Sequence, residues 1–247
     1  MNTEQTLIEH LEELRKRIIV CLVTTALCTL VCYFYIDQIL AILSKPAGHL
    51  VFIKPAEAFF VKIKVAFYGA LVVAMPVLIY QAWKFVSPGL IKTEKQHIYW
   101  LVPVSYLLFV SGLLFGFFLV LPQGLKFLLA CGAENIEPMI SVSSYISFVT
   151  IFLLGFGIVF QLPLVILFLT KMGIVTPQSL SKNRKYAILA IFIVAGVLTP
   201  GPDIFSQFMM AVPTLVLYEL SILLSRIVFR KKEQKEEVIE VDDPAYR

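Results

Sequence analysis

The apolar residues of this chain fall in long blocks, and this feature limits the possible folds more than any other. Of its 247 residues 59% are hydrophobic and only 15% are charged, and the mean hydropathy is +0.85. A soluble domain carries roughly 25% charged residues and shows short apolar periods. Blocks of about 20 apolar residues suit helices that cross a bilayer. The sequence therefore predicts an all-α integral membrane protein.

Six blocks are predicted to be transmembrane helices, of which the last two are short. They lie at about 18–36, 59–85, 98–121, 145–170, 186–198 and 204–225. The first is predicted to be retained, because its flank is acidic as well as basic and no small-x-small cleavage site follows it. Pro76 predicts a kink in the second. The fifth is shorter than the roughly 20 residues a span requires. It is therefore interpreted as one of two short spans or, alternatively, as half of a re-entrant hairpin.

Lysine and arginine gather at one set of helix ends. They flank the first span, fill the 2–3 and 4–5 loops and follow the last span, whereas the other loops carry few. By the positive-inside rule both termini are predicted to be cytoplasmic. This topology, rather than nucleic-acid binding, explains the net charge of +4. Residues 1–230 are predicted to form the membrane domain, and the mixed-charge residues 231–247 a disordered cytoplasmic tail.

The sequence has few residues that could carry chemistry. It contains no phosphate-binding Gly-x-x-x-x-Gly-Lys-Ser/Thr loop, no metal-ligand cluster and no Gly-x-Ser-x-Gly, so no enzyme, metal or cofactor is predicted. The strongest polar candidate within a span is Gln161. It either bonds to a neighbouring helix or serves a polar path. A small-solute carrier or channel is the alternative function, although such carriers usually keep a carboxylate or histidine in the membrane.

Acidic residues stand in front of the first span. Glu12 and Glu13 precede the cations Arg15, Lys16 and Arg17. Their spacing allows the i,i+4 pairs Glu12–Lys16 and Glu13–Arg17, in which the acids only neutralise their own helix. Alternatively the acids receive a cationic ligand from the cytoplasm. Glu94, after the second span, is a second acid on the same predicted side, or simply a solvated loop charge.

Several ordered motifs resemble the TatC family, the multi-spanning receptor of the twin-arginine, Sec-independent protein translocase. The His10–Arg17 segment is similar to the family's N-terminal signature, and residues 76–90 to its second span and following loop. Residues 144–148 open the fourth span as in the family, and residues 198–207 match its turn between two short helices. The resemblance covers about residues 5–230 and implies a glove-like concave bundle.

The family binds signal peptides that carry two adjacent arginines. The resemblance implies that Glu13 and Glu94 are the signal-binding acids, and that Arg17 and Phe85 belong to the same surface. Its remaining implied positions are Pro46 and Glu57 in the outer loop, Asp203 in the turn, and Thr199 and Gln207 where the partners dock.

The resemblance also implies a function and its partners. The chain would be the receptor subunit that exports folded proteins across the cytoplasmic membrane, driven by the proton motive force. It would work with single-span TatA- and TatB-type subunits and with further copies of itself. A mid-membrane position that is often Glu in the family is Gln161 here. We therefore predict a packing or positioning role for Gln161, because an amide does not titrate.

Overall fold

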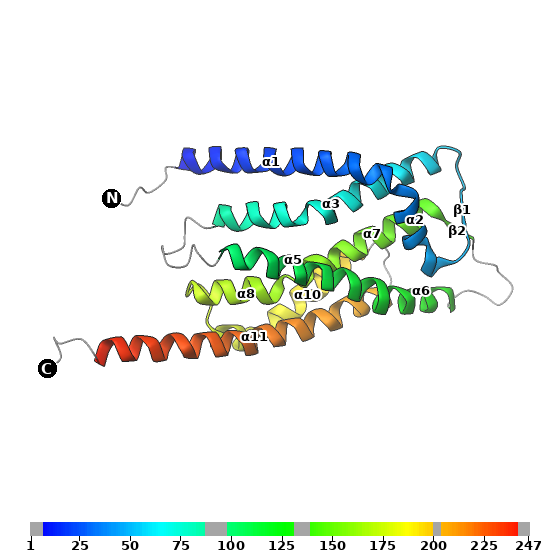
Figure 1. The fold of residues 1–247 in the computed structure, drawn as a ribbon. Coiled ribbons are helices and arrows are strands. Elements are labelled where there is room, and N and C mark those ends of the chain that lie inside the picture. The colour runs from blue at the N-terminus through cyan, green and yellow to red at the C-terminus, as the bar shows by residue number, and fades with distance from the viewer. Residues whose placement is uncertain (1–6, 87–97, 131–138, 200–203, 242–247) are drawn as a thin grey trace.

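The computed structural model describes residues 7–86, 98–130, 139–199 and 204–241. The chain is almost entirely helical (Figure 1). Its elements are α1 (Leu7–Phe34), α2 (Ile36–Ser44), the 3-10 helix η1 (Lys45–Ala47), β1 (Leu50–Val51), α3 (Glu57–Val86), α5 (Ile98–Phe115), the π-helical turn η3 (Gly116–Val120), α6 (Leu121–Ala130), β2 (Ile140–Ser141), α7 (Val142–Val159), α8 (Leu162–Lys171), α9 (Pro177–Lys182), α10 (Arg184–Leu198) and α11 (Ile204–Val241).

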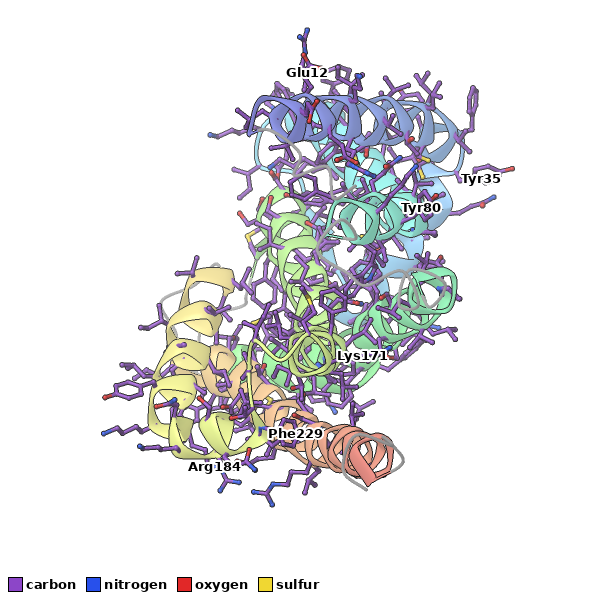
Figure 2. All side chains as sticks on the ribbon, turned by 90° about the vertical axis from the view of Figure 1, so that its left-hand side faces the viewer. Glu12, Tyr35, Tyr80, Lys171, Arg184 and Phe229 are labelled. Atoms are coloured by element: carbon purple, nitrogen blue, oxygen red, sulfur yellow. The ribbon has the colours of Figure 1, made fainter. Side chains whose placement is uncertain are left out.

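The long helices lie side by side, with α1 and α11 at opposite edges (Figure 1). Helix α1 packs against α3, α7 packs against α3 and α5, and α11 packs against α8 and α10. We call the end where α1 begins and α11 ends the terminal end, and the end that carries β1 and β2 the strand end. Seen from the terminal end, α8 lies between α1 and α11, and α10 stands to one side (Figure 2).

Five helical stretches of the described chain are long and apolar enough to cross a membrane. They are Leu11–Phe34, Glu57–Phe85, Leu101–Ala130, Val142–Lys171 and Ile204–Phe229. Helix α10 has 15 residues and is about 22 Å long, less than the roughly 30 Å of a hydrocarbon core. The prediction of an all-α membrane protein with a short fifth helix is confirmed. The sixth span was also predicted to be short, but it belongs to α11, which runs for 38 residues.

Two helices extend further than the sequence predicts. Helix α11 continues through residues 231–241, where a disordered tail is expected. This segment is rich in Lys, Glu and Gln, which favour helix, and contains no Gly or Pro. The third span continues through η3 into α6 and ends at Ala130 instead of about residue 121. The π-helical turn ends at Val120, two residues before Pro122, a residue that lacks a backbone donor.

Small residues let α5 and α7 approach closely. A Cβ atom at Gly157 would lie 2.4 Å from Cε2 of Phe109, and one at Gly112 would lie 2.7 Å from the carbonyl oxygen of Phe156. Phe109 and Phe156 are both fully buried. Close backbone approach through glycine is a common way to pack helices in a membrane, where apolar burial alone does not drive association.

The strand end is closed by polar contacts between loops. β1 and β2 form a parallel pair in which Leu50 faces Ile140 and Val51 faces Ser141. The phenol of Tyr145 donates to the carbonyl of Leu43, 2.8 Å away, and so joins α7 to the end of α2. The strand pair and this hydrogen bond thereby connect the segment after α1 to β2 and the start of α7.

Candidate functional site

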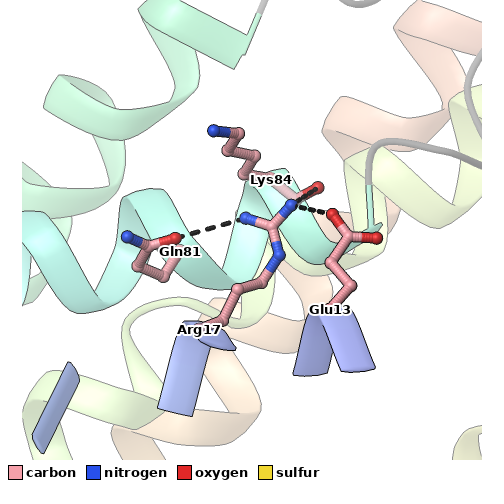
Figure 3. A network of polar contacts seen from close by, with 4 residues as sticks. All are labelled: Glu13, Arg17, Gln81 and Lys84. Atoms are coloured by element: carbon pink, nitrogen blue, oxygen red, sulfur yellow. Dashed lines mark hydrogen bonds and ion pairs between the residues drawn. The ribbon is translucent and has the colours of Figure 1, made fainter. Parts of the chain in front are cut away.

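Arg17 joins α1 to α3 near the terminal end (Figure 3). Its Nη1 donates to Oε1 of Gln81 at 3.2 Å, and its Nη2 donates to the carbonyl oxygen of Lys84 at 3.3 Å. Nη2 also donates to the carboxylate of Glu13. Arg17 is only 9% exposed, so this guanidinium is a buried bridge between helices as well as a flanking charge.

Glu13 is held by Arg17 through one carboxylate oxygen, Oε1. The i,i+4 pair that the spacing allows is therefore formed. The other oxygen, Oε2, is shielded from solvent and accepts no hydrogen bond from the described part of the chain. Nε of Arg17 is also shielded and donates no hydrogen bond to any described residue. The site thus contains one shielded acceptor and one shielded donor without partners. Leaving such a group unsatisfied costs about 1–3 kcal/mol.

Glu12 differs from Glu13 although the two are neighbours in sequence. Its side chain is exposed, and within the described residues the Glu12–Lys16 ion pair does not form. The helix register explains the difference, because adjacent residues point about 100° apart around a helix. Only Glu13 shares the face of Arg17 that meets α3.

Gln81 and Lys84 were not predicted as members of this site. Their only sequence signal is a spacing of three, which places them on one face of α3. Phe85 lies in the same last turn of α3 and is half-buried. Glu94 and Asp203 lie outside the described residues.

Gln161 lies where the fourth span breaks between α7 and α8. Its Nε2 donates to the carbonyl oxygen of Ser105 on α5 at 2.8 Å. The Ser105 hydroxyl accepts a bond from Nε1 of Trp83 on α3 at 3.1 Å, and Ser105 is fully buried. Of the two interpretations of Gln161, the structure shows the hydrogen bond to a neighbouring helix.

Thr199 and Gln207 bind the backbone of α10. The hydroxyl of Thr199, which is buried, donates to the carbonyl of Ala195 at 2.9 Å. Nε2 of Gln207 donates from α11 to the carbonyl of Phe192 at 2.8 Å. Thr199 therefore fixes the last turn of α10, and Gln207 joins α11 to the body of α10.

Glu57 and Pro46 lie at the strand end. Pro46 is the second residue of η1. The Glu57 carboxylate accepts four hydrogen bonds: Oε2 from the backbone of Ile53 (2.7 Å) and Lys54 (3.1 Å), and Oε1 from the backbone of Ser143 (2.8 Å) and the hydroxyl of Ser141. Glu57 is thus bound as an acceptor, in its carboxylate form.

The bundle of apolar helices, closed at one end and carrying a buried polar network near the other, defines a multi-pass membrane protein of the all-α class. A family model described as "Sec-independent protein translocase protein (TatC)" matches residues 9–213. The chain belongs to this family. It is therefore a component of a protein translocase, and this assignment replaces the solute-carrier alternative.

Individual relatives agree over almost the whole chain. The TatC protein of Carboxydothermus hydrogenoformans is 44% identical over 92% of this chain and 95% of its own length. That of Aquifex aeolicus is 38% identical over 92% of this chain and 98% of its own. The solved structure entitled "Crystal Structure of Twin Arginine Translocase Receptor- TatC" has a TM-score of 0.81 and 37% identity, covering 89% of this chain and 99% of that one.

Proposed function

We propose that the chain is the receptor that binds twin-arginine signal peptides, with Glu13 and Glu94 as the two acids. The observation that supports this proposal is that Glu13, although paired with Arg17, keeps its side chain 27% exposed, while its second oxygen, Oε2, has no donor among the described residues. A guanidinium from a ligand supplies such a donor. The printed description of the similar solved structure as a twin-arginine translocase receptor agrees with this function for that protein.

Arg17 prepares Glu13 for a ligand. It holds Oε1 of Glu13 while α3 holds Arg17 through Gln81 and Lys84. The carboxylate is therefore oriented before a ligand arrives, which lowers the conformational cost of binding.

Charge balance explains why a second acid is needed. The Glu13–Arg17 pair is neutral as a unit, so it binds an incoming cation through a hydrogen bond more than through net charge. Two ligand arginines bring two positive charges, and Glu94 supplies a carboxylate outside the pair. Guanidinium groups are planar and donate in a fixed fork, so two acids on separate segments favour arginine over lysine.

The remaining steps follow the predicted topology. The terminal end faces the cytoplasm, because α1 begins and α11 ends there (Figure 1) and both of these helix ends are rich in Lys and Arg. TatA- and TatB-type single-span subunits dock where Thr199 and Gln207 hold α10, and further copies of the chain join the complex. Folded precursors then cross the cytoplasmic membrane at the expense of the proton motive force.

Binding of a twin-arginine signal peptide to the protein in lipid nanodiscs tests the proposal. Glu13→Ala and Glu94→Ala are each expected to weaken binding about tenfold or more, since a charge-assisted hydrogen bond contributes about 1.5–3 kcal/mol. Glu12→Ala, the matched change at an exposed acid, is expected to leave the affinity unchanged. Undiminished binding by the Glu13→Ala, Glu94→Ala double variant, or equal binding of a Lys-Lys peptide, would refute the proposal.

A further inference from the structure

Lys64 is a cation within the second span that has no acidic partner among the described residues. Its Nζ donates to the hydroxyl oxygen of Ser147 on α7 at 3.0 Å. Lys62, two residues earlier on α3, differs, because its Nζ lies 2.9 Å from Oδ1 of Asp37. A charged group in a membrane span is costly unless it finds a partner, and such groups commonly mark functional sites.

The pair of Lys64 and Ser147 offers donors to a third group. An ammonium has three donor hydrogens and no acceptor, so Ser147 must accept in this bond and keeps its own hydroxyl hydrogen. Within the described chain that hydrogen is given to no acceptor. Two hydrogens of Lys64 and one of Ser147 therefore remain for a ligand, which favours a compact anion with several oxygens.

The depth of this pair can be estimated from the helix starts. Glu57 binds Ser141 and Ser143, and so holds the first turns of α3 and α7 at one level. Ser147 follows Val142 by five residues, or about 7.5 Å, and Lys64 follows Glu57 by seven residues, or about 10.5 Å. The span Glu57–Phe85 has 29 residues, or about 43 Å, which exceeds a hydrocarbon core of about 30 Å by about 6–7 Å at each end. The backbone of the pair therefore lies about 1–4 Å below the boundary between headgroups and hydrocarbon, a depth from which the long side chain of Lys64 can reach the headgroups.

Aromatic side chains flank Lys64 on the same face of α3. Phe60 and Phe67 lie four residues before and three residues after it, and they are 56% and 45% exposed. This exposed apolar surface would meet acyl chains in a bilayer, and aromatic residues are enriched at the membrane interface. A cation and a hydroxyl at headgroup depth above an apolar surface match the chemistry of a phospholipid.

We propose that Lys64 and Ser147 bind the phosphate of an anionic phospholipid in the leaflet at the strand end. Basic pockets between transmembrane helices hold lipid headgroups on the cytoplasmic side of membranes, and the same pairing of a cation with a phosphate is available in the opposite leaflet. The positive charge of Lys64, which is paired with no acid among the described residues, favours an anionic lipid over a zwitterionic one, whose own cation would be repelled. The inference depends on the membrane position of α3 and α7, and is independent of signal-peptide binding at the terminal end.

Native mass spectrometry of the full chain, with phosphatidylglycerol or phosphatidylcholine added, tests this site. The wild-type protein is expected to bind phosphatidylglycerol more tightly, and Lys64→Gln is expected to weaken that binding about tenfold. Ser147→Ala is expected to weaken phosphatidylglycerol binding less, and Lys64→Arg is expected to retain it. Lys62→Gln is the control, because Lys62 is a nearby cation that is already paired with an acid, and it is expected to bind like the wild type. A melting curve of each variant checks that it is folded.

Three results would overturn the proposal. One is equal phosphatidylglycerol binding by the wild type and Lys64→Gln. A second is competition by millimolar inorganic phosphate, which would show a site for free phosphate rather than for a lipid. A third is the absence of any lipid preference in the wild type together with Lys64-dependent crosslinking to a membrane partner, which would assign the donors to a protein carboxylate.

Discussion

The carboxylate of Glu57 accepts a hydrogen bond from the hydroxyl of Ser141, although the two residues are 84 positions apart. The same carboxylate also accepts hydrogen bonds from the backbone N–H groups of Ile53, Lys54 and Ser143. Ser141 also caps the first turn of α7, because its hydroxyl oxygen accepts from the backbone of Ser144. One acidic side chain thus joins the loop before α3, the strand β2 and the start of α7.

Glu57→Ala is therefore expected to lower the melting temperature of the protein by several degrees, since four donors lose their shared acceptor. The residue is only 7% exposed, so water cannot fully replace the carboxylate. Asp37→Asn is the matched control, because Asp37 is an acid of the same end whose side chain is 80% exposed in its pair with Lys62. It is expected to change the melting temperature little. Equal melting temperatures of Glu57→Ala and wild type would contradict the role given to Glu57.

Arg17→Lys is expected to destabilise the protein and to weaken signal-peptide binding while keeping the positive charge. A lysine ammonium cannot reproduce the planar fork that reaches Gln81, the carbonyl of Lys84 and Glu13 together. The loss is expected to be about 2 kcal/mol, within the range for hydrogen bonds to charged groups.

The control for Arg17→Lys is Arg15→Lys, the same change at an exposed position of the same helix. It is expected to alter the free energy of unfolding by less than about 0.5 kcal/mol. Denaturant titration and peptide binding measure both variants. If the two variants behave alike, Arg17 acts only as one of three flanking charges.

The membrane helices could be predicted from the sequence because each leaves a block of apolar residues with a defined length. The short α10 could be predicted in the same way, because its block of apolar residues is shorter than the others. Burial of Arg17 could not be predicted, since Arg15, Lys16 and Arg17 are equivalent as flanking cations. Only the register of α1 against α3 turns Arg17 inward. Gln81 carries no signal of its own, because its partner lies 64 residues away.

The two strands of the strand end could not be predicted from the sequence for a different reason. β1 and β2 have two residues each, too few to show the alternation by which a strand is recognised. The extension of α11 was missed because charge density predicts disorder, while the same Lys and Glu residues favour helix. Composition alone does not decide between these two outcomes.

Gly157→Ala is expected to destabilise the packing of α5 on α7. The new Cβ would lie 2.4 Å from Cε2 and 2.6 Å from Cδ2 of Phe109, whose ring is fully buried. Overpacking of this kind typically costs about 1–3 kcal/mol.

Gly124→Ala in α6 is the matched control, because nothing lies within 4 Å of its new Cβ. That change is expected to be neutral or to stabilise by up to about 1 kcal/mol. Thermal unfolding of both variants measures the difference, and equal stability would show that α5 and α7 can separate slightly at no cost.

Gln161→Ala is expected to lower transport without altering the shape of its pH profile. The change removes the hydrogen bond from Nε2 of Gln161 to the carbonyl of Ser105, and with it one tie between α5 and the break between α7 and α8. Such bonds in membrane proteins are worth about 0.6 kcal/mol on average, so the protein should remain folded. Gln123→Ala, at an exposed amide of α6, is expected to leave transport unchanged. Export rates of the wild type and both variants, measured across a pH series, test this prediction. Because an amide does not titrate, a pH-dependent step that disappears in Gln161→Ala would show that Gln161 supports a proton-dependent group, and its role would then extend beyond positioning.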